Sequence, residues 1–156
     1  MAQDTWLSGL LSGNPTLALD GDTLTVKGSD ATITMMKQAP TPIEGTKWVL
    51  TGTVANEAIS SPPIDAVGSL TITDGQAAVE TGCNNGSGTV TVADTTLTFG
   101  PLATTRMACT PELDDLEAFT LSVLDGEVTY EITGDKLSIR KDATDGEIGL
   151  EYTAAE

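Results

Sequence analysis

The chain of 156 residues contains no histidine. This absence excludes Ser-His-Asp and Cys-His nucleophilic systems and every zinc site that needs an imidazole ligand. Cysteine is nearly absent too, because the two thiols are too few for a structural zinc site and do not form a C-x-x-C motif. Any chemistry must therefore come from carboxylates, hydroxyls, amides, a few cations and one pair of thiols.

Basic residues are scarce, with 7 Lys and Arg against 23 Asp and Glu and a formal net charge of −16. Only Arg140 and Lys141 are adjacent. Nucleic-acid binding needs a basic surface that displaces phosphate counterions, so we predict no nucleic-acid partner. Anionic membranes are disfavoured for the same reason. The acidic surface serves either solubility or docking to a cationic protein partner.

Long apolar runs are also missing. No segment approaches the roughly 20 residues that span a bilayer, so we predict no transmembrane segment in this chain. Residues 1–4 lack the basic and apolar regions of a signal peptide. The protein is then either cytoplasmic or a mature chain whose export segment has been removed. The glycine-rich stretch Gly82–Gly88 lacks the lysine of a phosphate-binding loop, so it is predicted to form a turn and no cofactor is expected.

Aromatic residues make up only 4% of the chain, and the apolar content comes mainly from Val, Ile, Leu and Ala interspersed with Thr. Short segments alternate between apolar and polar residues and are bounded by turn formers such as Asp74-Gly75 and Gly134-Asp135. We predict a mainly β (α+β) fold, an antiparallel meander or barrel-like sheet with one helix packed on it. The alternating pairs and triplets are Leu70/Ile72, Val90/Val92, Leu97/Phe99, Val128/Tyr130/Ile132, Leu137/Ile139 and Ile148/Leu150.

One helix is predicted from Pro111 to about Leu124. Thr110 offers an N-cap hydroxyl before the proline, and Asp125-Gly126 ends the helix. The stripe expected to face the sheet is Leu113, Leu116, Phe119 (or Thr120) and Val123, and the residues expected to face outward are Asp114, Asp115 and Glu117.

An internal similarity links the two ends of the chain. Shifted by 113 residues, Trp6–Lys27 aligns without a gap with Phe119–Arg140, and glycines and apolar positions keep one register. Beyond Lys27 the shift changes by two, so Ile33 is expected to match Ile148 and Met35 to match Leu150. We therefore predict an N-terminal helix-hairpin half-repeat at 1–38, the C-terminal remnant of a preceding repeat, then a Pro-rich linker at 39–44 and a complete domain at 45–153.

The complete domain carries an ordered series of motifs. These are Trp48-Val49-Leu50, Gly82-Cys83-Asn84 with Gly86 and Gly88, Thr105-Arg106-Met107-Ala108-Cys109, Glu117 with Phe119, and Tyr130-Glu131-Ile132-Thr133-Gly134-Asp135-Lys136-Leu137. The series resembles the META domain (HslJ-like) family, and residues 1–35 resemble only that family's C-terminal part. Val90 stands where the family often has an aromatic residue, so one core contact is expected to differ.

The resemblance implies a cellular location and no particular reaction. Family members are typically exported or lipid-anchored proteins of the bacterial envelope, tied to heat shock, stress, motility or virulence, and no catalytic mechanism defines the family. We therefore expect a non-enzymatic envelope or secreted module with a structural, stress-related or binding role. The alternatives are an inhibitor or scavenger that docks a cationic protein, and a hydrolase that uses only carboxylates and hydroxyls.

The two thiols allow three interpretations: a Cys83–Cys109 disulfide, two buried free thiols, or a reactive or metal-binding thiol. We predict the disulfide, which would stabilise the fold by about 3–4 kcal/mol and favours an extracytoplasmic location: periplasmic, secreted or lipid-anchored in the full-length protein. Arg106 either pairs with Glu117 or Asp115 or acts in recognition. A monomer is favoured, with a dimer through the half-repeat as the alternative.

Two acidic turns offer hard oxygen ligands for Ca²⁺, around Asp20-Gly21-Asp22 and around Asp142, Asp145 and Glu147. Neither has the spacing of an EF-hand, and solvated turns are the simpler interpretation. We therefore predict no metal site and no catalytic residue in this chain.

Overall fold

The computed structural model describes residues 2–155 and divides the chain into two compact units, Met1–Ala39 (unit 1) and Pro40–Glu156 (unit 2). Unit 1 consists of one helix, α1 (Ala2–Ser12), and an antiparallel sheet of three strands, β1 (Thr16–Asp20), β2 (Thr23–Lys27) and β3 (Thr32–Met36). Among the described residues, no helix is long and apolar enough to cross a membrane.

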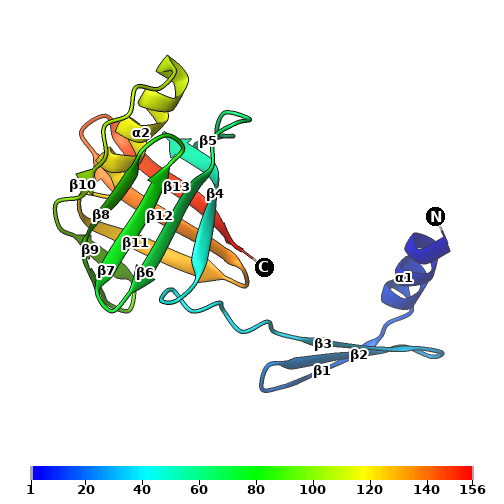
Figure 1. Ribbon diagram of the computed structural model, residues 1–156. Helices are drawn as coiled ribbons and strands as arrows, with labels where there is room; N and C mark the ends of the chain where they lie inside the picture. Colours follow the sequence, from blue (N-terminus) through cyan, green and yellow to red (C-terminus); the bar gives the residue numbers. More distant parts are fainter. Residues whose placement is uncertain (1, 156) are drawn as a thin grey trace. The chain divides into compact units, whose positions relative to one another are not determined.

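Unit 2 is an antiparallel barrel of eight strands, which confirms the predicted mainly β fold (Figure 1). The barrel closes because β8 pairs with both β7 and β9, so that the neighbours run β8-β7-β6-β4-β13-β12-β11-β9 and return to β8. The barrel strands are β4 (Lys47–Ala55), β6 (Gly68–Thr73), β7 (Gln76–Thr81), β8 (Asn85–Val92), β9 (Thr96–Phe99), β11 (Gly126–Thr133), β12 (Lys136–Ala143) and β13 (Gly146–Ala154); β5 (Ala58–Ser60) adds to β4, and β10 (Ala103–Thr104) adds to β8.

The barrel interior is filled by alternate side chains of its strands, as period-2 patterning requires. In β4, Trp48 and Leu50 point inward and are almost fully buried. Val90, the departure from the family pattern, is also buried in this core, so a smaller side chain occupies that place. The backbone of another segment passes close to Gly88, where an added Cβ would lie 2.7 Å from the Pro101 carbonyl oxygen.

The helix α2 (Pro111–Val123) forms where the sequence predicts it and lies beside the barrel. One detail of the prediction was wrong. Thr110 occupies the N-cap position, but its hydroxyl makes no capping hydrogen bond. The buried residues are Leu116, Thr120 and Val123, so the stripe contains Thr120 rather than its alternative Phe119, which is only half-buried.

Residues 41–44 are fixed on unit 2 by hydrogen bonds. The Thr41 amide donates to the Gly134 carbonyl at 2.8 Å, and the Trp48 indole donates to the Ile43 carbonyl at 3.2 Å. Glu44 forms an isolated bridge with Ile72 in β6. Most of the stretch predicted as a linker is therefore attached to the barrel.

The three strands of unit 1 repeat the pairing of β11, β12 and β13. Thr16 pairs with Lys27 as Thr129 pairs with Arg140, and the following four pairs keep the same 113-residue offset. The third strand differs from our prediction: Val26 pairs with Ile33 as Ile139 pairs with Leu150, so Ile33 matches Leu150. Met35 likewise matches Tyr152, and not Leu150. The error arose because β12 and β13 are longer than β2 and β3 and continue further before their turn, and the lengths of the strands cannot be read from apolar spacing.

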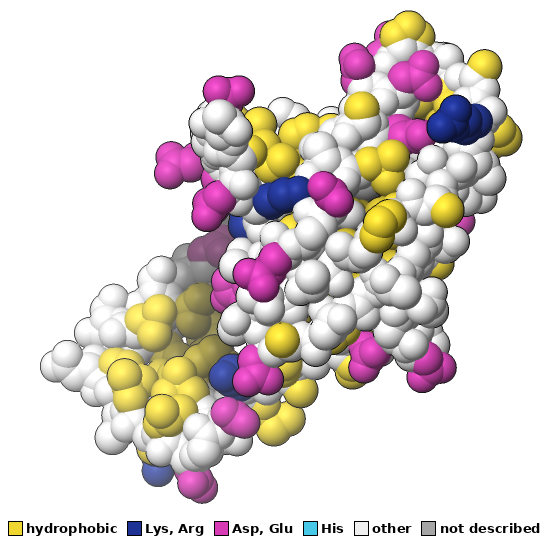
Figure 2. All heavy atoms as spheres, turned by 90° about the vertical axis from the view of Figure 1, so that its left-hand side faces the viewer, with side chains coloured by type: hydrophobic (Ala, Val, Ile, Leu, Met, Phe, Trp, Pro, Cys, Tyr) yellow, Lys and Arg dark blue, Asp and Glu magenta, His cyan; other side chains and the backbone are white. Residues whose placement is uncertain are grey.

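One face of the unit 1 sheet is apolar, and we call it the apolar face. Cross-strand pairing places six side chains on it, namely Leu17, Leu19, Leu24, Val26, Ile33 and Met35. Val26 is buried, whereas Leu17 and Leu19 are 65% and 74% exposed. Hydrophobic side chains gather visibly on unit 1, while acidic side chains are spread over unit 2 and basic ones are few (Figure 2).

Candidate functional site

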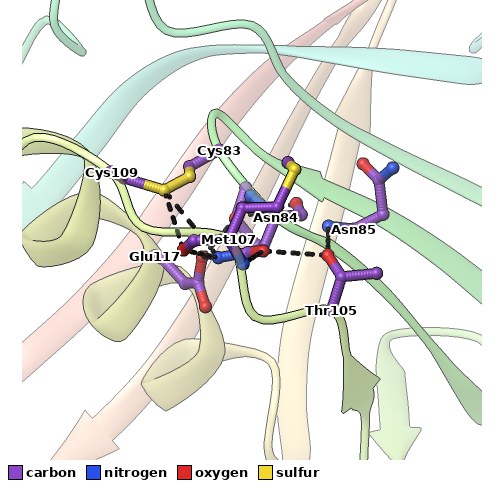
Figure 3. The surroundings of a disulfide bond; sticks show 8 residues. Cys83, Asn84, Asn85, Thr105, Met107, Cys109 and Glu117 are labelled. Carbon is purple, nitrogen blue, oxygen red and sulfur yellow. Dashed lines mark hydrogen bonds between the residues drawn. A yellow bond between two sulfur atoms is a disulfide. The ribbon is translucent and has the colours of Figure 1, made fainter.

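The residues of the family motifs fall into two groups. Trp48, Leu50 and half-buried Phe119 belong to the packing of the barrel and helix, and Gly134 and Asp135 form the β11–β12 turn. Gly88 lies within β8. The remaining residues belong to one surface location, where the β7–β8 turn faces the segment that leads into α2. Figure 3 shows Cys83, Asn84, Thr105, Met107, Cys109 and Glu117 there, and Gly82 and Arg106 are their neighbours in the chain.

Cys83 and Cys109 form a disulfide, as predicted, with their Cα atoms 6.2 Å apart. The bond joins the β7–β8 turn to the residue before the N-cap of α2. Gly82 adopts a left-handed φ of +96°, and an added Cβ would lie 3.3 Å from side-chain atoms of Leu116 and Ala66. Glycine is therefore needed at this position both for its backbone conformation and for the space beside α2.

Asn84 is the centre of a hydrogen-bond network beside the disulfide. Its side chain is buried, with 4% of the residue exposed. Its Oδ1 accepts hydrogen bonds from the Met107 amide at 2.7 Å and the Thr105 hydroxyl at 2.9 Å. Its Nδ2 donates to the Met107 carbonyl at 3.4 Å and to a Glu117 carboxylate oxygen at 2.8 Å. One amide group thus connects the turn, the following loop and the helix.

Glu117 lies under this loop and does not face outward as predicted. The same Oε2 atom accepts hydrogen bonds from Asn84 and from the Thr81 hydroxyl, the latter at 3.0 Å. The predicted pairing of Arg106 with Glu117 or Asp115 was wrong. The donors that bind Glu117 are thus neutral, and Arg106 is exposed and forms no ion pair or hydrogen bond with any residue that the structure describes.

The segment Thr105–Ala108, which we call the braced loop, is fixed along its backbone and open to solvent along its side chains. The Thr105 amide donates to the Asn85 carbonyl at 2.9 Å, and Asn85 donates to the Thr105 hydroxyl at 3.1 Å. All four residues of the loop are exposed, and Met107 has 58% of its surface accessible although its amide and carbonyl are both hydrogen-bonded.

A second surface of interest lies around Arg140, where a shallow concavity is lined in part by Glu127, Asp142 and Glu147. Its charges are paired: Arg140 lies 3.5 Å from Glu147 and also contacts Glu151, and the Lys141 ammonium donates to the Ser122 and Asp125 carbonyls at the end of α2. Within residues 2–155, no group of three or more Cys, Asp or Glu side chains is placed to hold a metal ion.

Two tyrosines and one carboxyl group have shifted pKa values. Burial raises the pKa of Tyr152 far above its usual range, and burial followed by the charges of Asp94 and Glu44 raises that of Tyr130. The hydrogen bond from Ser69 and then that from Lys47 lower the pKa of Glu80. Among the described residues, none of these three side chains has a hydrogen bond to the braced loop.

Sequence reasoning named Asn84 and Glu117 as motif residues without their roles, and it missed Thr81 and Asn85. The signal available for Thr81 was weak: a polar residue occupies the last position of a strand, next to Gly82. Its burial is complete, and its hydroxyl donates to Glu117 and accepts from the Asn84 amide at 3.1 Å.

Comparison with known proteins gives a family and a fold. A family model described as the META domain matches residues 41–148, more than half of the chain. A solution NMR structure of a protein from Burkholderia xenovorans is 22% identical, with a TM-score of 0.58, and covers 83% of this chain and 97% of its own. A second NMR structure is 20% identical, with a TM-score of 0.53, and the match covers 70% of this chain and 89% of the other. Comparison with curated proteins found no match.

Proposed function

Since this chain belongs to the META domain family, we propose that its barrel is a non-enzymatic binding module that works outside the cytoplasm and recognises a partner through the braced loop. The proposal does not include a reaction. It concerns one exposed segment, Thr105–Ala108, and the residues that hold it in place.

The single observation that supports the proposal is the relation between the loop's backbone and its side chains. A buried amide, a carboxylate and a disulfide all serve to fix residues 105–109, yet residues 106–108 are exposed and do not belong to the barrel core. Fixing a loop before binding lowers the conformational entropy lost in the complex. The arrangement has a clear use in recognition and little use in packing.

The disulfide supports a location outside the cytoplasm, because such bonds persist in oxidising compartments and are rare where thiols are kept reduced. The disulfide and Asn84 fix the same segment, because Cys109 lies two residues after Met107, whose amide donates to Asn84. Reduction would release one end of the braced loop. The proposed compartment and the proposed site therefore depend on one structural feature.

A binding experiment tests the proposal with a control on the same barrel. The full chain is immobilised and exposed to the periplasmic and secreted proteins of its source, in parallel with the double variant Arg106→Gln, Met107→Gln and the variant Ile59→Gln. Ile59 is 68% exposed and lies on β5, outside the loop. We expect a partner that the wild type and Ile59→Gln retain and the loop variant loses. Identical retention by all three proteins would contradict a role of the loop.

A further inference from the structure

Arg106 is placed as a specificity side chain would be. It is exposed, and among the described residues neither its guanidinium group nor its backbone N–H and C=O has a hydrogen-bond partner. The residues on both sides are fixed, Thr105 through Asn85 and Met107 through Asn84. An unpaired arginine between two anchored residues offers its side chain and its free backbone groups to the same partner.

Arg106 has no other charged residue near it in the sequence. From Thr95 to Pro111 the chain has no acidic residue, although unit 2 carries 19 acidic against five basic residues, a formal charge of −14. No residue of the braced loop has a left-handed φ, a backbone conformation that strands avoid. Addition of the loop as a short strand to the edge of a binding cleft would bring the arginine into an acidic pocket.

We infer that the partner is a serine protease with arginine specificity and that the braced loop binds its active-site cleft as an inhibitor. This inference rests on the proposed function of the same loop. Such a protease has an aspartate at the base of its specificity pocket, which binds a guanidinium group in a desolvated setting. The free backbone groups of Arg106 are those that a protease cleft must reach around the bond it attacks.

The bracing explains inhibition rather than rapid cleavage. Hydrolysis of the Arg106–Met107 peptide bond would consume one water and leave a carboxylate on Arg106 and an amine on Met107. The Asn84 side chain accepts a hydrogen bond from the Met107 nitrogen and donates one to the Met107 carbonyl, and the disulfide fixes Cys109. The new amine would therefore stay beside the acyl group instead of leaving, which favours reclosure of the bond.

The acidic surface of the barrel adds a second, longer-range attraction to the protease. A protein of net charge −16 attracts a cationic protease and accelerates their encounter, and salt weakens this attraction. The charge and the loop thus have separate roles, since the barrel surface affects the association rate and Arg106 decides whether the complex persists.

The test uses the oxidised full chain and trypsin whose catalytic serine is replaced by alanine. We expect binding that benzamidine, a small ligand of the specificity pocket, displaces. Arg106→Gln should weaken binding by about 30-fold or more, as for a central interface residue. Lys136→Gln is the matched control, because Lys136 is an exposed cation of unit 2 that likewise has no ion pair among the described residues.

Three results would overturn the inference: no binding to the inactive trypsin, binding that benzamidine does not displace, or equal affinity of Arg106→Gln and Lys136→Gln. With active trypsin, cleavage of the oxidised chain at Arg106 as fast as that of a free peptide of residues 101–112 would also overturn it. The proposed function is judged separately, because loss of a native partner by the loop variant would stand even if trypsin did not bind.

Discussion

The Oδ1 atom of Asn84 lies 2.7 Å from the backbone nitrogen of Met107, a residue 23 positions later in the chain. The same side chain donates to the Met107 carbonyl, so it replaces the strand partner that this part of the loop lacks. A buried side-chain amide can satisfy both backbone groups of one residue because it carries a donor and an acceptor side by side. The loop is ordered by this contact, and not by secondary structure.

Asn84→Ala should therefore release the braced loop. The change leaves the Met107 amide without its acceptor and the Glu117 Oε2 atom with the Thr81 hydroxyl as its remaining donor, and an unsatisfied group of this kind costs about 1–3 kcal/mol. We expect a lower urea midpoint and faster amide exchange at Met107, with a smaller acceleration at Leu137 in the barrel. Asn85→Ala is a suitable control, since Asn85 uses its backbone and not its side chain in the network. Unchanged exchange at Met107 would contradict the role given to Asn84.

Reducing the disulfide, or replacing both cysteines by serine, should destabilise unit 2 by about 3 kcal/mol, as expected for a loop closed over 26 residues. Non-reducing peptide mapping should recover Cys83 and Cys109 in one linked peptide from protein isolated under oxidising conditions. Alkylation of both thiols in native, air-oxidised protein would show that the bond does not form.

The barrel could be predicted from the sequence because its strands alternate and its turns use residues that tolerate left-handed φ, as Asp74 and Gly75 do. The network of Asn84 could not be predicted in this way, since its partners lie in a loop without periodicity. Glu117 was misplaced because it follows Leu116 directly, at the border of the buried face, where helical spacing does not decide between solvent and a neighbouring loop. The pairing of Arg106 with Glu117 was predicted from their opposite charges alone. That reasoning leaves out neutral donors such as Thr81 and Asn84, which bind the Glu117 carboxylate.

The two candidates for the helix core should differ in measured stability. Leu116 is 6% exposed, so Leu116→Ala should lower the free energy of unfolding by about 2–5 kcal/mol. Phe119 is half-buried, so Phe119→Ala should cost less than the roughly 3–5 kcal/mol of a fully buried phenylalanine. Chemical denaturation of both variants measures the difference. A larger loss for Phe119→Ala would show that Phe119, and not its alternative Thr120, belongs to the buried stripe.

Glu80 should make a small contribution to acid sensitivity. Ser69 and then Lys47 lower its pKa in the folded state, so its carboxylate stabilises the fold above the ordinary glutamate range and this contribution is lost as pH falls through the folded pKa. Because Glu80 and Lys47 are 43% and 51% exposed, the effect should stay below about 1 kcal/mol. Thermal melts between pH 7 and pH 3 should show a slightly flatter acid limb for Glu80→Gln than for the wild type, and parallel curves would contradict this assignment.

Unit 1 should be folded and not a mobile tail. Its strands repeat the pairing of β11–β13, and in the barrel the residues matching Leu24, Val26 and Ile33 are fully buried. Of the three residues in unit 1, only Val26 is buried. The helix α1 nevertheless packs close to the sheet, since a Cβ on Gly28 would lie 2.5 Å from a methyl carbon of Leu10.

The exposed leucines of the apolar face would each gain about 1.5–3 kcal/mol if covered, and a sheet this small is marginal without cover. We therefore expect slow amide exchange in β2, whose neighbours pair on both sides, and faster exchange in the edge strands β1 and β3. Random-coil exchange throughout residues 17–35, with Leu97 and Ile132 still protected, would refute the folded unit. Light scattering over a dilution series then decides whether a second copy supplies the cover, because only a dimer through the apolar face would dissociate on dilution and lose protection in β2 as it does so.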